Sequence, residues 1–91
     1  DLTRPHYNLA TLYAQQGSMD LAIRHYVKVT ELDPEVIEAH YNLGLAYAMQ
    51  GKLKQAISEW EKVLQLDPHH RGAANNLAKA KEMIKSSGDL N

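Results

Sequence analysis

The stretch HYNLGLAYAMQG at residues 40–51 repeats, with few changes, the stretch HYNLATLYAQQG at residues 6–17. The likeness continues without a gap, and both copies end in Leu-Asp-Pro. A fixed period of 34 residues is typical of stacked helical or strand units, none of which can bury its apolar face alone. The sequence therefore predicts a repeat protein with units at residues 1–34 and 35–68.

Each unit reads as two amphipathic helices. In the first unit, the apolar residues that recur at three- and four-residue steps are Leu9, Ala10 and Tyr13, followed by Ala22, Ile23, Tyr26 and Val29. Because this period is that of a helix and not of a strand, we expect an all-α fold. The expected helices lie near residues 4–16, 19–32, 36–50, 53–66 and 70–85.

The turns between these helices carry recognisable residues. Gly17 and Gly51 fall where a helix ends with a residue that is free to adopt positive φ, and Ser18 can cap the helix that follows. An Asp-Pro pair stops the second helix of each unit, at residues 33–34 and 67–68, because proline disfavours helical geometry in the residue before it.

The spacing of small and large residues resembles the tetratricopeptide repeat. Small side chains stand where the helices must approach closely, and large ones stand where they pack into the neighbouring helix. His6 and His40 depart from the pattern, since the family often has another aromatic residue there. The resemblance implies a right-handed superhelical stack of antiparallel helix pairs, an α-solenoid of about five helices. It rests on Leu9, Ala10, Tyr13, Ala22, Tyr26 and Pro34, repeated as Leu43, Gly44, Tyr47, Ala56, Trp60 and Pro68.

The last part of the chain begins a third unit and then departs from it. Residues 69–86 read as a capping helix, and residues 87–91 as a flexible tail. We expect Ala73, Ala74, Leu77, Ala80 and Ile84 to cover the second unit, and Arg71, Lys79, Glu82 and Lys85 to face water. No comparable cap is expected before the first helix. Because the chain opens on Asp1 and not on Met, we expect either processing of the chain or its excision from a longer protein.

Composition argues against several classes of function. The chain has 10 Lys and Arg against 11 Asp and Glu, and the two signs are interspersed, so neither nucleic acid nor an anionic membrane surface is an expected partner. No apolar run reaches the roughly 20 residues that a membrane span needs. Without Cys there is neither a disulfide framework nor a thiolate nucleophile. The compartment stays open.

A second stripe of side chains follows the first helix of each unit, apart from the core stripe. By the family resemblance, the first helices line a concave groove, so this stripe would form its wall. Asparagine recurs along it every 34 residues, and an amide both donates to and accepts from a peptide backbone, whatever the side chains of that peptide. Similar asparagine ladders hold peptide in O-linked N-acetylglucosamine transferases. The predicted groove residues are Asn8, Asn42, Asn76, Tyr7, Tyr41, Thr11, Leu45 and Met49.

Structural roles for the same residues remain open. Each asparagine could instead form hydrogen bonds within the helix packing, and each tyrosine could pack between adjacent first helices. Aromatic and methionine side chains otherwise suit an adaptable binding surface. Met83 would extend that surface to the last helix.

One function known in the family is argued against. Co-chaperone repeats hold a C-terminal carboxylate with Lys and Arg in the groove, and here only Asn42 matches; Tyr7, Gly72 and Asn76 occupy the basic positions. A terminal carboxylate would therefore lack cationic partners. Capture of a chaperone tail is not expected.

Neither a metal site nor catalysis is expected. His69 and His70 stand in a turn, and His6 and His40 belong to repeats about 10 Å apart, too far to share one ion. No nucleophile stands in a pattern with a base, and no Gly-rich phosphate loop is present. We expect no cofactor and no enzymatic activity.

Three functions remain open. The first is a protein-interaction module that binds an extended peptide segment of a partner in its groove. The second is a scaffold that self-assembles through its uncapped N-terminal face. The third is a substrate-recruiting arm of a larger enzyme.

Overall fold

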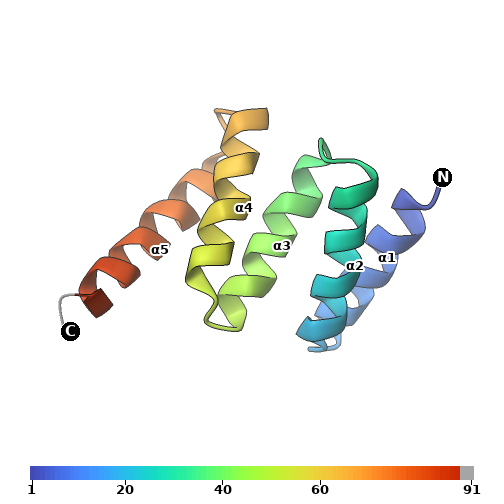
Figure 1. The fold of residues 1–91 in the computed structure, drawn as a ribbon, viewed down its shortest axis with the longest axis horizontal. Helices are drawn as coiled ribbons and strands as arrows, with labels where there is room; N and C mark the ends of the chain where they lie inside the picture. Colours follow the sequence, from blue (N-terminus) through green and yellow to red (C-terminus); the bar gives the residue numbers. More distant parts are fainter. Residues whose placement is uncertain (89–91) are drawn as a thin grey trace.

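The computed structural model describes residues 1–88 and contains, in that part of the chain, five helices and no strand. Successive helices run antiparallel and form one row, with the first and the last helix at opposite ends (Figure 1). The all-α repeat fold is thus confirmed. The helices are α1 (Thr3–Gln15), α2 (Met19–Leu32), α3 (Ile37–Met49), α4 (Leu53–Leu66) and α5 (Arg71–Gly88).

The helix bounds agree closely with the expected ones, except at the end of the chain. Helix α5 includes Ser87 and Gly88, the first two residues of the segment expected to be a tail. The rest of that segment, residues 89–91, lies outside the described part of the chain. Within residues 1–88, no helix combines the length and the apolar character needed to cross a bilayer.

The turn inside each repeat is built on a glycine in the left-handed region. Gly17 has a φ of 82°, its N–H donates to the carbonyl of Ala14 at 3.1 Å, and the N–H of Ser18 donates to the carbonyl of Tyr13 at 2.8 Å. These are the two hydrogen bonds of a Schellman motif, and they satisfy carbonyls at the end of α1. Gly51, with a φ of 76°, makes the same turn in the second repeat.

The prediction that Ser18 caps α2 with its side chain is wrong. Ser18 occupies the N-cap position, and its carbonyl accepts a hydrogen bond from the N–H of Ala22 at 3.0 Å. Its hydroxyl forms no capping hydrogen bond. With a ψ of 71°, the residue lies outside the extended conformation from which a capping side chain usually reaches the first turn.

Aspartate organises the turn between repeats. Asp33 ends α2 in an extended conformation, with a φ of −148°, and its Oδ1 accepts a hydrogen bond from the N–H of Glu35 at 3.0 Å. Asp67 ends α4 with a φ of −141° and accepts from the N–H of His69, also at 3.0 Å. Such side-chain-to-backbone bonds mimic a turn of the main chain.

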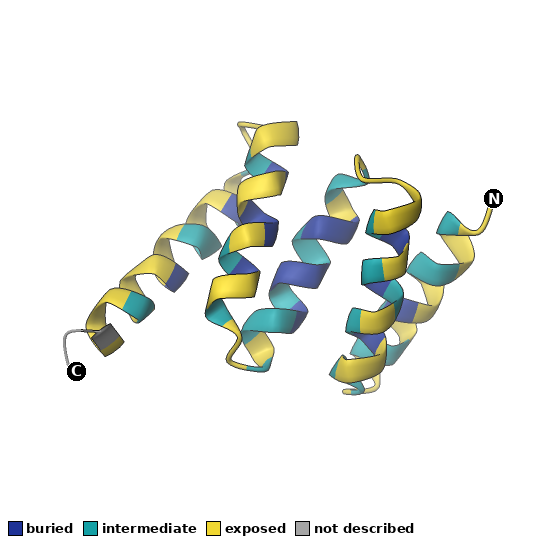
Figure 2. Cartoon of the chain, viewed as in Figure 1, coloured by how far each residue is buried: buried dark blue, intermediate teal, exposed yellow. Residues whose placement is uncertain are grey.

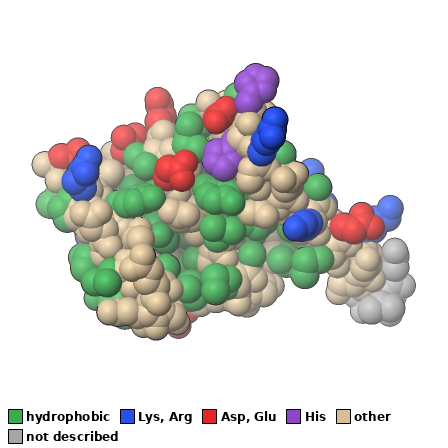
Figure 3. Space-filling view, turned by 180° about the vertical axis from the view of Figure 1, so that it is seen from behind, with side chains coloured by type: hydrophobic (Ala, Val, Ile, Leu, Met, Phe, Trp, Pro, Cys, Tyr) green, Lys and Arg blue, Asp and Glu red, His purple; other side chains and the backbone are tan. Residues whose placement is uncertain are grey.

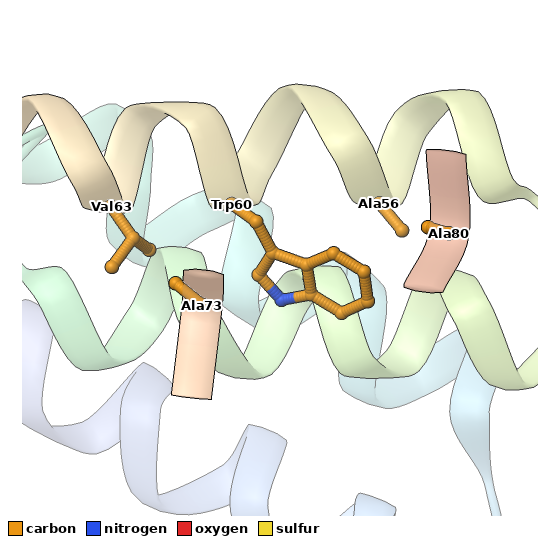
Figure 4. Packing of buried hydrophobic residues seen from close by; sticks show 5 residues of the cluster. All are labelled: Ala56, Trp60, Val63, Ala73 and Ala80. Atoms are coloured by element: carbon orange, nitrogen blue, oxygen red, sulfur yellow. The ribbon is translucent and has the colours of Figure 1, made fainter. Parts of the chain in front are cut away.

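The core of each repeat is completed by the next helix along the chain. Buried Ala10, Ala22 and Tyr26 of the first repeat form one cluster with Leu43, which comes from α3. In the second repeat, Trp60 packs against alanines of α5 (Figure 4). That second cluster contains Ala56, Trp60, Val63, Ala73 and Ala80. No repeat therefore forms a closed core by itself, as expected of stacked units.

Exposed residues are frequent on the two end helices, α1 and α5, whereas α3 in the middle of the row is mostly buried or half-buried (Figure 2). In α5, Ala73 and Ala80 are buried, while its predicted water-facing charged residues are exposed. Ala74 was expected among the covering residues and is exposed instead. The prediction that Leu9 belongs to the core is also wrong: Leu9 is 40% exposed, whereas its equivalent Leu43 is 1% exposed because α2 covers it.

Candidate functional site

The predicted groove residues lie on the first helix of each repeat and on α5. Tyr7, Asn8 and Thr11 belong to α1, and Asn76 belongs to α5. The remaining four, Tyr41, Asn42, Leu45 and Met49, belong to α3. Of the whole set, Asn8 and Met49 are exposed and the others are half-buried. We call these eight residues the groove wall.

Two of the three asparagines bridge neighbouring repeats. The Nδ2 of Asn42 donates to the hydroxyl of Tyr7 at 3.0 Å, and the Nδ2 of Asn76 donates to the hydroxyl of Tyr41 at 3.3 Å. Both bonds join residues that are 35 positions apart. The side chain of Asn8, at the free end of the row, forms no hydrogen bond within residues 1–88. The asparagine and tyrosine positions of the sequence pattern are thus partners of each other.

The bridging leaves one side of each amide unused. An asparagine has two N–H donors and a carbonyl acceptor, and the tyrosine takes one donor. Within the described residues, Oδ1 of Asn42 accepts no hydrogen bond from the protein. The side-chain carbonyl of Asn42 can therefore accept a hydrogen bond from a bound molecule.

Part of the groove wall lines a hollow of about 290 Å³, which we call the α1–α3 hollow. Its mouth includes Met49, whose side chain is 70% exposed. Thr11 also lines it and forms a hydrogen bond of 3.2 Å with the hydroxyl of Tyr26. The full lining is Thr11, Ala14, Gln15, Met19, Tyr26, Asn42, Leu45, Ala46 and Met49, with no charged side chain among them.

A second hollow of about 450 Å³ lies at the start of α1. Tyr7 and Asn8 line it together with Asp1, Arg4 and Glu38, so both signs of charge are present. Burial raises the pKa of Tyr7, and the nearby Tyr26 and Glu38 raise it further, while the hydrogen bond from Asn42 opposes this change. The phenol of Tyr7 therefore loses its proton only at a higher pH than an ordinary tyrosine does.

The face opposite to the view of Figure 1 carries gathered hydrophobic side chains, with charged groups mostly around them (Figure 3). Such an apolar surface with a polar rim is typical of a contact site.

Sequence reasoning missed several residues of this site. Tyr26 and Met19, both from α2, close the α1–α3 hollow from the side of the second helix. His70 packs its ring on Tyr41, with the ring centres 4.8 Å apart, and its Nδ1 accepts a hydrogen bond from the N–H of Ala73 at 3.0 Å. The recurrence of a large aromatic residue at positions 26 and 60 indicated a packing role but not that Tyr26 lines the α1–α3 hollow.

Comparison with known proteins agrees with this architecture. A sequence model described as TPR repeat matches residues 10–51, and one described as tetratricopeptide repeat matches residues 37–70. The comparison with curated proteins gave no match.

Several solved structures superpose closely on the chain. MamA protein is 32% identical with a TM-score of 0.87, and the match covers 90% of this chain and 45% of MamA. The first TPR of Spaghetti (RPAP3), solved with the HSP90 peptide SRMEEVD, is 24% identical with a TM-score of 0.87, over 91% of this chain and 66% of that one. The TPR2B domain of yeast Sti1, solved in complex with pHsp70, is 20% identical with a TM-score of 0.85, over 96% and 70%.

The match thus covers between about half and about two thirds of the length of these structures. The 34-residue period, the paired helices, the glycine and Asp-Pro turns and the two sequence matches all agree. This chain belongs to the tetratricopeptide repeat family, as two repeats followed by a capping helix.

Proposed function

We propose that this domain is a non-catalytic protein-interaction module that binds an extended peptide segment along its groove wall. The observation that carries the proposal is the α1–α3 hollow, where an apolar cavity lies directly beside the unused carbonyl of Asn42. A backbone N–H of the peptide can donate a hydrogen bond to that carbonyl while the adjacent side chain of the same peptide enters the hollow. Leu45 and the exposed Met49 would contact this side chain, and methionine adapts readily to different shapes.

The charge of the groove favours an uncharged apolar segment. The α1–α3 hollow has no charged lining, and the hollow at the start of α1 combines Arg4 with Asp1 and Glu38. The peptide SRMEEVD bound by the RPAP3 domain is acidic, and an acidic segment would find no cluster of Lys or Arg here. This chain should therefore select a different class of ligand from that domain.

Selection from a displayed library of random peptides would test the proposal. Peptides with a large apolar side chain should be enriched, and their binding should weaken about tenfold or more in Met49→Lys, since a charge would then have to be buried against the peptide. Binding would be followed by fluorescence anisotropy, with SRMEEVD as a peptide expected not to bind.

Leu66→Lys is the matched control, because Leu66 lines a different hollow, with Pro34 and His40. It should leave peptide affinity unchanged. Failure to enrich any peptide, or equal affinity in Met49→Lys and the native chain, would contradict the proposal.

One observation favours self-association as a second candidate. Leu2, just before α1, is 64% exposed, and Leu9 and Leu12 on α1 are 40% and 47% exposed. The positions equivalent to Leu9 and Leu12 in the second repeat are Leu43 and Ala46, which are 1% and 3% exposed beneath α2. The outer face of α1 thus corresponds to the face of α3 that α2 covers, but no helix of this chain covers it within residues 1–88. Two copies of the chain could cover it by joining these faces about a twofold axis.

Sedimentation equilibrium over a wide range of concentration would test this second candidate. A reversible dimer is expected in the native chain, and Leu9→Gln with Leu12→Gln should shift the protein to a monomer. A monomer at every concentration of the native chain would rule the twofold contact out.

A further inference from the structure

The wall of the α1–α3 hollow contains one pair of hydroxyl groups. Oγ1 of Thr11, from α1, lies 3.2 Å from the hydroxyl oxygen of Tyr26, from α2, and both residues line the hollow. Tyr26 is 3% exposed, whereas Thr11 is half-buried. The ring of Tyr7 packs edge-on against that of Tyr26, with the ring centres 5.8 Å apart. The hydroxyl of Tyr26 is therefore held in place by the packing of its ring.

This pair of hydroxyls has one more proton than it uses internally. Each hydroxyl carries one proton, and a single hydrogen bond between the two oxygens uses only one of them. Within residues 1–88, neither the hydroxyl of Thr11 nor that of Tyr26 forms a second hydrogen bond. Whichever oxygen donates, the proton of the other one has no acceptor in the described part of the chain.

The unused proton belongs to Thr11. A phenol is more acidic than an aliphatic hydroxyl, which makes Tyr26 the donor and Thr11 the acceptor of the bond between them. Threonine in a helix often donates its proton to a backbone carbonyl three or four residues earlier, as Thr30 does to the carbonyl of Val27 at 2.9 Å. Thr11 forms no such bond to any of residues 1–88. Its proton is therefore available to a molecule in the hollow.

The second repeat has no counterpart of this pair. Leu45 stands at the position equivalent to Thr11, and Trp60 stands at the position equivalent to Tyr26. The one polar donor of Trp60, Nε1, is used in a hydrogen bond of 3.2 Å to the carbonyl of Tyr41. The unused proton is thus a property of the α1–α3 hollow and not of the repeat fold.

A ligand side chain that fills the hollow has to accept this proton. Water can accept it while the hollow is open, but a bound side chain displaces that water, and a hydroxyl left without a partner then weakens binding. A carboxylate is a poor acceptor here, because no charged residue lines the hollow and the negative charge would be buried without compensation. The acceptor should therefore be an uncharged oxygen.

Tyrosine is the side chain that meets these conditions. The volume of about 290 Å³ lies just below the roughly 300–1,000 Å³ of pockets for small molecules and suits one large side chain. Leu45 and Met49 in the lining require an apolar body, and tyrosine combines an aromatic ring with a terminal hydroxyl. That hydroxyl can accept from Thr11. For its own proton, the same lining offers Oδ1 of Asn42, whose second lone pair still accepts a backbone N–H.

We propose that the α1–α3 hollow is a tyrosine-selective pocket, in which the side chain of a peptide tyrosine accepts a hydrogen bond from the Thr11–Tyr26 pair. This inference rests on the proposed function and names the side chain that the hollow takes. Its mark is the sign of one difference. An apolar pocket without a free donor binds phenylalanine more tightly than tyrosine, because the tyrosine hydroxyl loses its water there. The unused proton should reverse that order, so that tyrosine binds about 5–10-fold more tightly than phenylalanine.

Two matched peptides would test the selectivity. Each is a capped peptide of alanine and serine with one aromatic residue at its centre, which is tyrosine in one peptide and phenylalanine in the other. Titration of the isotope-labelled domain, followed by NMR chemical shifts, measures weak binding and also locates it. The tyrosine peptide should bind about 5–10-fold more tightly, and the shifts should centre on the residues that line the hollow.

A double variant removes the hydroxyl pair without changing its shape. Thr11→Val with Tyr26→Phe replaces both partners of one hydrogen bond by apolar groups, a change that is nearly neutral for stability, so the domain should stay folded. The order of the two peptides should then invert in favour of phenylalanine. Thr30→Val is the matched control, because Thr30 lines a different hollow and its proton is already used by Val27. It should keep the native order.

The possible failures separate this inference from the proposed function. Equal affinity of the two peptides for the native chain, or tighter binding of the phenylalanine peptide, would overturn the selectivity while peptide binding itself stands. A tyrosine preference that persists in the double variant, or shifts centred outside the hollow, would equally overturn it. If neither peptide binds but the library selection yields other ligands, only the tyrosine inference fails. If the selection also yields none, both fail.

Discussion

The amide of Asn42 donates to the hydroxyl of Tyr7 at 3.0 Å and so connects the first helices of two repeats. One side chain thereby belongs both to the packing and to the candidate site, because its N–H is used internally while its carbonyl is unused. Tyr41 and Asn76 repeat the contact between α3 and α5 at 3.3 Å.

Removal of either partner should therefore destabilise the fold as well as alter the groove. Tyr7→Phe and Asn42→Ala should each lower the free energy of unfolding by about 0.5–1.5 kcal/mol, since the net value of one such hydrogen bond is of that order. Urea unfolding of both single variants and the double variant would measure their coupling. Strictly additive losses would show that the bond contributes nothing.

Gly44 marks the closest approach of α3 to Trp60 of α4. A Cβ at this position would lie 2.7 Å from Cδ1 and 2.8 Å from Cε2 of the indole. Gly44→Ala should therefore cost about 1–3 kcal/mol by overpacking. It should also disturb the hydrogen bond of 3.2 Å from Nε1 of Trp60 to the carbonyl of Tyr41.

The first repeat indicates how to relieve this clash, because it has Ala10 where the second has Gly44, and Tyr26 where the second has Trp60. The double variant Gly44→Ala with Trp60→Tyr should lose less stability than the sum of the single variants. Thermal unfolding followed by circular dichroism would measure the stability of the native chain, the two single variants and the double variant. If the stability losses of the single variants simply add in the double variant, the side chains at positions 44 and 60 are not coupled.

Gly17 and Gly51 are required for their backbone conformation and not for space, since a Cβ at either position would meet nothing within 4 Å. Replacement of either glycine by Ala should cost about 1–2 kcal/mol, because L-residues are strained at positive φ. Gly17→Asn should cost less, as asparagine tolerates this region. Urea midpoints in which Asn is no better than Ala would contradict this reasoning.

Alkaline pH should weaken the fold through Tyr7. Burial and the neighbouring Tyr26 and Glu38 raise its folded pKa above the ordinary value of 10.0, so the folded state disfavours the phenolate. The resulting stabilisation is complete below pH 10.0 and is lost as the pH rises through the raised pKa. In Tyr7→Phe, stability should decline less steeply above pH 10.0 than in the native chain, with Tyr47 still contributing. An equally steep decline of stability with pH in Tyr7→Phe and the native chain would show that Tyr7 does not contribute to it.

Local signals account for the features that were predicted correctly. The 3.6-residue spacing of apolar side chains, the two glycines and the two Asp-Pro pairs act within a few residues of each other, so helices and turns can be predicted from them without knowledge of the tertiary contacts. The exact period then requires successive helix pairs to stack in the same way. The errors on burial occurred where a neighbouring helix decides it, as with exposed Leu9 and buried Leu43. The error at Ser18 was local, because its backbone conformation does not bring the hydroxyl to the first turn of α2.

The groove wall shows the same division. Its residues could be predicted from the sequence as a stripe on the first helices, and hydrogen bonds of the asparagines within the packing were one of the alternatives. The stripe did not identify Tyr7 as the partner of Asn42. Nor did it indicate that Tyr26 of α2 completes the lining of the hollow. These contacts depend on how far one helix is shifted and rotated against another.

The sequence by itself determined the helices, the turns, the repeat and its stacking, because these follow from periodicity and from backbone preferences that act over short distances. The tertiary structure alone decided which polar groups meet: Asn42 with Tyr7, His6 with His25, and His40 with Glu59. Partners 19 or 35 residues apart come within hydrogen-bond distance only through the rotation and spacing of packed helices. A shift of a single ångström between helices is enough to make or break such a bond, whereas the apolar periodicity of the sequence would be unaffected.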